Sequence, residues 1–129
     1  MPRLLIVDDE HQILELLAFT LGLQGYEVHT ARGGAEALAR AAALPPDLVI
    51  LDVLMRPMDG FQLARALRAH PPGPAIVFLS GLTGAEHVAQ GLALGDAYLM
   101  KPFRPSELVE TVEAVLAARP RATGSLSFL

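Results

Sequence analysis

Five short apolar runs alternate with five stretches of helical periodicity along the 129-residue chain. This alternation constrains the fold more than any other feature of the sequence. The runs are rich in Val, Ile and Leu, which is typical of strands buried on both faces of a parallel sheet. Five successive strand–helix units, joined by right-handed crossovers, predict an α/β fold with a doubly wound five-stranded parallel sheet.

The expected elements follow from the hydrophobic period and from the residues that start and stop helices. Asp59 is a candidate N-cap, and Pro105 suits the first position of a helix. The expected strands cover residues 3–7, 27–31, 47–51, 74–79 and 97–100. The expected helices cover residues 11–23, 35–44, 61–69, 85–94 and 105–118. Residues 1–119 then form one domain, and residues 120–129 are predicted to be a flexible tail or linker stub.

Composition excludes several classes of protein. Without cysteine the chain has no disulfide framework, thiolate metal site or cysteine nucleophile. The formal net charge of −4 and the scarcity of aromatic residues argue against a nucleic-acid-binding surface. Charges and prolines interrupt every apolar run, and acidic residues come too early for a signal peptide. We therefore expect a cytoplasmic domain that binds neither nucleic acid nor membrane.

Polar side chains follow four of the five expected strands. Asp8, Asp9 and Glu10 come after the first strand, and Asp52 follows the third. Ser80 follows the fourth strand, and Lys101 follows the fifth. Because ligands of such sheets bind at the carboxyl ends of the strands, these groups are expected to form one site. Lys101 is the only lysine beside nine arginines, which makes an incidental role for it less plausible.

The acids at this edge require a cation or protons. Two carboxylates about 4 Å apart repel by on the order of 4 kcal/mol at an effective dielectric constant of 20. A set of oxygen ligands without His or Cys favours Mg²⁺, which keeps coordination positions for a phosphoryl group. Lys101 and Ser80 would supply a point charge and a hydroxyl donor to that group. Asp52 is then a candidate nucleophile that forms an aspartyl phosphate.

Each assignment has a simpler structural alternative. Asp8 and Asp9 are also suited to the start of the first helix, where acids favour the helix dipole. Ser80 and Asp52 occur at ordinary loop starts, and Tyr98 is equally suited to core packing. The four histidines, at positions 11, 29, 70 and 87, are interpreted as surface residues and not as ligands.

At these residues the sequence resembles the response-regulator receiver domain of two-component signalling, which is CheY-like. The resemblance covers about residues 3–118. It is carried by the Asp8-Asp9 pair, by Leu51-Asp52, by Phe78-Leu79-Ser80-Gly81 and by the segment from Tyr98 to Phe103, Tyr-Leu-Met-Lys-Pro-Phe. It implies a flavodoxin-like fold in three layers with strand order 2-1-3-4-5.

The resemblance also implies a role for each site residue. Asp52 would be the phosphoacceptor, and Lys101 and Ser80 would bind the phosphoryl oxygens. Asp9 would bind Mg²⁺ directly, Asp8 mainly through water, and the backbone carbonyl of Leu54 would be a further ligand beside Asp52. Ser80 and Tyr98 would form the conformational switch, in which Tyr98 turns inward as Ser80 moves toward the phosphoryl group.

By the same resemblance, the chain is a signalling switch and not an enzyme, apart from assisting its own phosphotransfer and dephosphorylation. Its partners would be a sensor histidine kinase or phosphotransfer protein, and an effector on the face of the fourth helix, fifth strand and fifth helix. Two alternatives remain open: a Mg²⁺-dependent aspartyl phosphatase of the haloacid dehalogenase type, and a receiver-like scaffold that is not phosphorylated.

The chain departs from the family pattern near the site. Arg56 stands where a proline usually lies, four residues after the acceptor, and Pro57 follows it. The turn before Tyr98 is one residue shorter than usual. Ala97, Thr111 and a fourth helix without Lys or Arg give little support to the salt-bridged dimer of DNA-binding relatives. Leu54 and Leu82 occupy positions that flank the path of the attacking water in the family, so slow self-dephosphorylation is expected.

Overall fold

A computed structural model describes residues 1–69, 71, 73–82 and 84–119. Five parallel strands form one sheet in the order β2-β1-β3-β4-β5. The strands are β1 (Arg3–Val7), β2 (Glu27–Ala31), β3 (Leu48–Asp52), β4 (Ala75–Ser80) and β5 (Ala97–Met100). The helices are α1 (His11–Gly22), α2 (Gly34–Ala43), α3 (Gly60–Leu67), α4 (Ala85–Leu94) and α5 (Pro105–Ala118). The predicted strand order and the alternation of strands and helices are confirmed.

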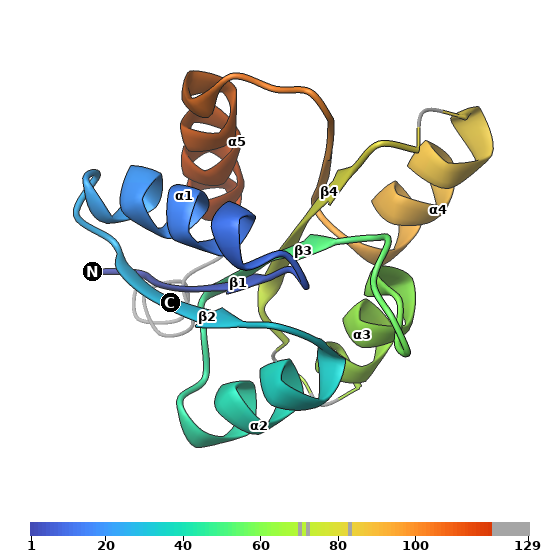
Figure 1. Ribbon diagram of the computed structural model, residues 1–129, viewed down its shortest axis with the longest axis horizontal. Coiled ribbons are helices and arrows are strands. Elements are labelled where there is room, and N and C mark those ends of the chain that lie inside the picture. The colour runs from blue at the N-terminus through green and yellow to red at the C-terminus, as the bar shows by residue number, and fades with distance from the viewer. Residues whose placement is uncertain (70, 72, 83, 120–129) are drawn as a thin grey trace, which may run out of the picture.

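The sheet is the middle of three layers (Figure 1). Helices α1 and α5 cover one side, and α2, α3 and α4 cover the other. Alternate residues of each central strand therefore enter different cores. In β1, Leu4 and Ile6 pack beneath α1 and α5, whereas Leu5 and Val7 pack beneath α2 and α3. No helix in the described part of the chain is long and apolar enough to cross a bilayer.

Strands β3 and β4 each end in a candidate site residue, Asp52 and Ser80. Every residue of β3 and β4 is buried, which is expected of strands covered on both faces. Both strands run one residue beyond their predicted ends, so Asp52 and Ser80 belong to the sheet and not to the loops that follow it. The ladder holds Asp52 opposite Leu79, which fixes the height of the carboxylate at the sheet edge.

Helix boundaries differ from the predicted ones by up to two residues. Helices α1 and α3 end one and two residues early, at Gly22 and Leu67, and α2 is shifted by one residue. The predicted N-cap is confirmed: Asp59 accepts a hydrogen bond from the backbone N–H of Gln62, 2.9 Å away, and Gln62 reciprocates in a capping box. The predicted tail, residues 120–129, lies outside the described residues.

Only Gly95 and Asp96 connect α4 to β5, as the short turn in the sequence indicates. The Asp96 carboxylate accepts hydrogen bonds from the backbone N–H of Ile76 and from the Arg68 guanidinium. The backbone N–H of Asp96 also donates to the carbonyl of Ile76, 2.8 Å away. These bonds tie the turn to the start of β4, so the short connection is firmly held.

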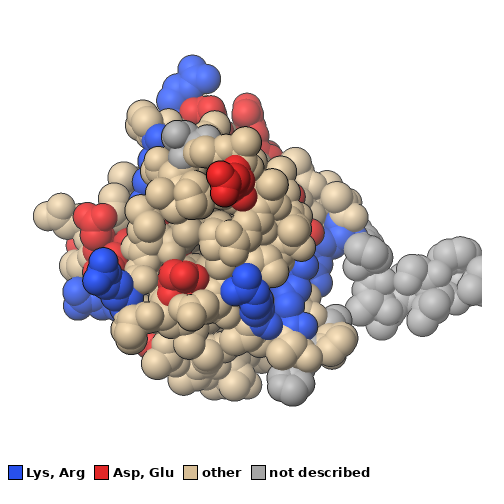
Figure 2. Space-filling model, turned by 90° about the vertical axis from the view of Figure 1, so that its right-hand side faces the viewer, with Lys and Arg blue, Asp and Glu red and all other residues tan. Residues whose placement is uncertain are grey.

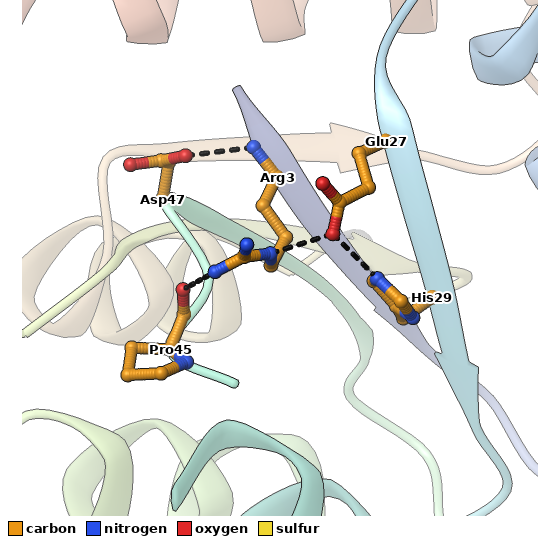
Figure 3. Close-up of polar contacts among 5 residues, drawn as sticks. All are labelled: Arg3, Glu27, His29, Pro45 and Asp47. Carbon is orange, nitrogen blue, oxygen red and sulfur yellow. Dashed lines mark hydrogen bonds and ion pairs between the residues drawn. The ribbon is translucent and has the colours of Figure 1, made fainter. Parts of the chain in front are cut away.

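The opposite end of the sheet, where the strands begin, is joined by arginine side chains. The Arg3 guanidinium donates to Glu27 Oε2 at 2.7 Å and to the carbonyl of Pro45 at 3.1 Å (Figure 3). The same carboxylate oxygen of Glu27 contacts His29 Nε2. Arg119 donates similarly to the carbonyls of Asp47 and Gly73. Planar guanidinium groups suit this role because each has several N–H donors and can donate to two acceptors on neighbouring segments.

Candidate functional site

Three carboxylates meet at the carboxyl edge of the sheet, as predicted. Asp8 and Asp9 follow β1, and Asp52 ends the neighbouring strand β3. One carboxylate oxygen of each residue lies within 4.8 Å of the others. Asp8 and Asp52 are buried, whereas Asp9 is exposed at the mouth of the cluster. The site therefore has two carboxylates that are shielded from water and one that faces it.

Asp8 is the most perturbed acid of the cluster. Its side chain is 1% exposed, and its Oδ1 accepts a hydrogen bond from the backbone N–H of Glu10. Its Oδ2 is buried and has no hydrogen-bond partner among the described residues. Burial, together with the nearby charge of Asp52, raises the pKa of Asp8 to about 6. A buried carboxylate oxygen without a hydrogen-bond donor is able to bind a cation or a proton.

Lys101 supplies a positive charge to both buried acids. Its Nζ lies 3.6 Å from Asp52 Oδ1 and 4.0 Å from Asp8 Oδ2. Burial raises the pKa of Asp52, and the Lys101 ammonium opposes that rise. The backbone N–H of Leu54 donates to Asp52 Oδ1 at 3.3 Å and also favours the charged carboxylate. The structure therefore places the Lys101 ammonium within ion-pair distance of both buried acids.

Ser80 and Tyr98 are both linked to Leu82, the second residue after β4. The Ser80 side chain is fully buried, and its Oγ accepts a hydrogen bond from the backbone N–H of Leu82 at 2.9 Å. The Tyr98 hydroxyl donates to the Leu82 carbonyl at 3.0 Å. The half-buried Tyr98 ring packs against Phe78, with the ring centroids 6.2 Å apart. Tyr98 thus does pack against the core, while its hydroxyl contacts the loop that follows Ser80.

The acid cluster has the chemistry of a site for a hard divalent cation. It offers carboxylate oxygens only, in a charge-dense group with one buried oxygen that accepts no hydrogen bond. The capping alternative is weaker, since the N-cap of α1 is Glu10 and no side chain caps that helix. Among the described histidines, His11 is exposed, His29 contacts Glu27, and none joins the acid cluster. His70 lies outside the described residues.

A hollow of about 580 Å³ opens beside the acids, and the sequence did not predict it. It lies between the β3–α3 loop and the start of α4. Its apolar part includes Leu54, which is 57% exposed, and Leu82. Its polar lining consists of Asp9, Arg56, Asp59, His87 and Gln90. The hollow could not be predicted from the sequence, because it depends on how the β3–α3 loop and helix α4, which are distant in the chain, pack against each other.

The chain matches one family model and many solved structures of known proteins. Residues 4–113 match the model of the response regulator receiver domain. A structure of the chemotaxis response regulator CheY4 of Vibrio cholerae superimposes with a TM-score of 0.83 at 37% identity, covering 89% of this chain and 98% of that one. A putative response regulator from Chloroflexus aurantiacus gives a TM-score of 0.84 at 38% identity, covering 90% of this chain and 98% of that one.

Sequence relatives extend the match. The transcriptional regulatory protein PrrA of Mycobacterium tuberculosis is 41% identical over 98% of this chain and 54% of its own length. The DNA-binding response regulator MtrA of Mycolicibacterium smegmatis is 41% identical over 88% of this chain and 50% of its own length. This chain belongs to the response regulator receiver domain family of two-component signalling. It spans about half the length of these relatives.

Proposed function

We propose that this domain is a phosphorylation-dependent switch whose phosphoacceptor is Asp52. The observation that carries the proposal is the position of Lys101 Nζ, 3.6 Å from Asp52 Oδ1 and 4.0 Å from Asp8 Oδ2, beside the carboxylate of Asp9. Such a group combines a nucleophile, a cation for phosphoryl oxygens and acids suited to a metal. Membership of the family supports the same assignment.

In the proposed reaction, a carboxylate oxygen of Asp52 attacks the phosphorus of a phosphohistidine on a sensor kinase or phosphotransfer protein. The new P–O bond forms as the P–N bond breaks, and the electron pair of that bond stays on the imidazole nitrogen. Lys101 would neutralise charge on the phosphoryl oxygens as a point charge. The Ser80 hydroxyl, whose oxygen already accepts from Leu82, retains its proton for donation to the phosphoryl group.

The cation that fits the acid cluster is Mg²⁺, which receiver domains typically bind at such an acidic pocket. Asp8, Asp9, Asp52 and the backbone carbonyl of Leu54 would hold it. When bound, Mg²⁺ neutralises charge on the phosphoryl group during transfer. Two observations support this assignment: Asp8 Oδ2 is buried and accepts no hydrogen bond, and the pKa of its carboxyl group is raised. A bound cation would interact with that oxygen and favour the charged carboxylate.

The output of the switch is proposed to be a change of partner at the face made by α4, β5 and α5. Phosphorylation converts the singly charged Asp52 carboxylate into an acyl phosphate that carries about two negative charges beside Ser80 and Lys101, and so biases two conformations of the domain. Tyr98 contacts both the β4–α4 loop, through the Leu82 carbonyl, and the core beneath α4. It is therefore placed to relay a movement of that loop to β5. PrrA and MtrA are regulators of transcription or DNA-binding proteins by name, but our proposal for this domain includes no DNA binding.

The decisive experiment is intact mass spectrometry of the chain after incubation with Mg²⁺ and acetyl phosphate, beside the matched variant Asp52→Asn. The expected result is a gain of one phosphoryl group that requires Mg²⁺ and is absent in Asp52→Asn. A gain that persists in Asp52→Asn would exclude Asp52 as the acceptor. If neither acetyl phosphate nor a histidine kinase modified the wild-type chain, the non-phosphorylated scaffold would be the better description. Turnover of a generic phosphomonoester would instead support the phosphatase alternative.

A further inference from the structure

A second hollow, of about 240 Å³, lies at the edge of the sheet where the strands begin, opposite the acid cluster. We call it the amino-edge hollow. Its polar lining consists of Arg3 from β1, His29 from β2 and Arg40 from α2, and its apolar lining includes Leu44 and Pro46. No carboxylate of the described residues lines it. Its volume is slightly below the range of about 300 Å³ and more that is usual for ligand pockets, so it suits a small ligand.

The register of the sheet explains why basic groups gather here. In the ladder between β1 and β2, Arg3 is opposite Glu27, and Leu5 is opposite His29. Side chains two residues apart in a strand share a face, and Leu5 packs in the core beneath α2. Arg3, Glu27 and His29 therefore lie on the face that α2 covers. Arg40 stands in the last turn of α2, where its charge offsets the partial negative charge of the helix end.

The two arginines are paired with acids but keep donors for a ligand. Arg3 donates from Nε to Glu27 at 2.7 Å and from Nη1 to the Pro45 carbonyl at 3.1 Å (Figure 3). Arg40 donates from Nε to Glu36 at 3.0 Å. Within the described part of the chain, Arg3 Nη2 and both Nη groups of Arg40 donate to no acceptor. The pairs thus hold two planar guanidinium groups in place, and the remaining N–H donors are available to the hollow.

The acids that hold these arginines are themselves engaged outside the lining. Glu27 Oε2 also contacts His29 Nε2 at 2.8 Å, and Glu36 Oε1 accepts from the backbone N–H of Arg32 at 3.1 Å. The side of the molecule that carries α3 and α4 differs, because acidic and basic side chains are interspersed there over a mostly uncharged surface (Figure 2). The amino-edge hollow therefore combines guanidinium donors with an apolar wall and has no carboxylate of its own among the described residues.

We propose that the amino-edge hollow binds a small organic carboxylate, with the Nη groups of Arg40 and Arg3 as donors. The ligand carboxylate would accept charge-assisted hydrogen bonds from the guanidinium groups, and its short apolar body would contact Leu44 and Pro46. Because each arginine is already paired with one acid, the site has no excess of positive charge, and we expect a Kd on the order of 1 mM. The site lies at the opposite edge of the sheet from Asp52, so the proposal does not depend on phosphorylation.

The probes for this site are benzoate and benzamide, which share a ring and differ in the charge of the group attached to it. Each is titrated into the full ¹⁵N-labelled chain at pH 7.5 and low ionic strength, and the backbone amide signals of Leu5, His29 and Leu44 are followed by NMR. Benzoate should shift these signals in a saturable way. Benzamide should bind about fivefold more weakly, since a neutral amide lacks the charge-assisted bonds. Shifts that do not saturate with benzoate, or equal affinities for the two probes, would overturn the proposal.

Two variants break the same ion pair from opposite sides. Arg40→Gln removes the donor and should weaken benzoate binding about three- to fivefold, the range of a solvent-exposed charge interaction. Glu36→Gln leaves the guanidinium without its competing acid, so binding should be retained or strengthened up to about twofold. If the pair had only a structural role, both variants would weaken binding alike, which would contradict the assignment of Arg40 as a donor.

A further pair of variants keeps this comparison interpretable. Arg40→Lys keeps the charge without the planar fork and should bind benzoate with an affinity between those of the wild type and Arg40→Gln. It replaces Arg40→Gln if the NMR spectrum of that variant shows an unfolded chain. Arg65→Gln is the control, because Arg65 is an exposed arginine of α3 that does not line the amino-edge hollow. Its affinity should equal that of the wild type, and a matching loss in Arg65→Gln and Arg40→Gln would show that benzoate responds to overall charge and not to this site.

Discussion

The ammonium of Lys101 lies 3.6 Å from Asp52 Oδ1, at the edge of the sheet where strands β3 and β5 both end. Strands β3 and β5 are not neighbours, because β4 lies between them. The side chain must therefore reach across the end of β4, where Ser80 is buried. A compact charge on a long flexible stem suits this geometry, whereas the planar guanidinium that the chain uses elsewhere does not.

Replacing Lys101 by Met should destabilise the folded domain in a pH-dependent way. The ammonium lowers the pKa of both Asp52 and Asp8, so its removal raises both values and leaves two buried acids without a cation. At pH 7.5 we expect a loss of about 1 kcal/mol in the free energy of unfolding, because Lys101 is partly exposed. Near pH 3, below the ordinary pKa of 3.8, both acids are largely protonated in the folded and the unfolded state, and the loss should nearly vanish. Urea denaturation at the two pH values measures this, with Arg65→Met as the control. A loss that is equal at both pH values would contradict the explanation.

Asp8→Asn should stabilise the metal-free domain. The pKa of Asp8 is raised to about 6 from an ordinary value of 3.8, so the folded state binds a proton more tightly than the unfolded state between these values. Stability therefore falls as the pH rises through this window, and the charged carboxylate costs up to about 3 kcal/mol above it. An amide retains an acceptor for the N–H of Glu10 without the charge. We expect a gain of about 1–3 kcal/mol at pH 7.5 in EDTA and little change near pH 4.

Mg²⁺ should reverse the order of stability of the wild type and Asp8→Asn. Under the proposed metal assignment, the ion binds the charged carboxylates of the folded wild type, and it should raise the wild-type melting temperature at pH 7.5 but have little effect on Asp8→Asn. Binding must displace the proton from Asp8, so the apparent affinity is expected to fall by about tenfold per pH unit below pH 6. Calorimetric titration at pH 7.5 and pH 5 measures the change. Equal affinities at both pH values would show that Asp8 does not hold the ion.

Gly91→Ala should disturb the packing of Tyr98. Gly91 is the only buried residue of α4, and a Cβ atom at this position would overlap the Tyr98 ring. We expect a loss of about 1–3 kcal/mol, the usual cost of adding a methyl group to a packed core. Gly22→Ala is the matched control, because Gly22 is also helical but has no atom near the added group. That variant should be neutral or slightly stabilising, since Ala favours helix. The same stability for both alanine variants would contradict the close packing of Gly91 against Tyr98.

Much of this architecture can be predicted from the sequence because its signals are local. The apolar runs identify strands at residues 3–7, 27–31 and 97–100 to the residue, and Asp59 caps its helix as expected. The strand ends then bring Asp8, Asp52 and Lys101 together, because parallel strands end at a common edge. What the sequence misses at Asp52 and Ser80 is that a strand continues into its polar residue. An acid or a hydroxyl there resembles a loop start unless the neighbouring strands are known.

Other features depend on contacts between distant segments and have no local signal. The hollow lined by Arg56 and His87 requires a loop after β3 to face a helix after β4. The single buried residue of α4, Gly91, acquires its role only once Tyr98 from the next strand lies against it. Similarly, Arg119 contacts carbonyl groups of residues 47 and 73, far away in the chain. Sequence spacing carries no information on such pairs, because tertiary packing alone brings them together.

The exposed side chain of Leu54 is expected to shield the acyl phosphate that the proposed function places on Asp52. Leu54 and Leu82 line the hollow beside the acids, and neither can hold a water molecule by hydrogen bonds. Leu54→Asn places an amide there, which can orient a water molecule toward the acyl phosphate. The backbone carbonyl of residue 54 and its N–H bond to Asp52 are unchanged by the substitution. We expect phospho-Asp52 to decay about fivefold faster, equivalent to about 1 kcal/mol in the barrier.

Decay is followed by intact mass after the phosphodonor is removed, and Leu92→Asn is the matched control. Leu92 is 53% exposed, close to the 57% of Leu54, and lies on α4 away from the hollow. The control should decay at the wild-type rate, because its amide cannot reach the phosphoryl group. If Leu54→Asn also decayed at that rate, the leucine side chain would not shield the acyl phosphate. If both variants decayed faster, a general loosening of the domain, and not the chemistry of position 54, would be responsible.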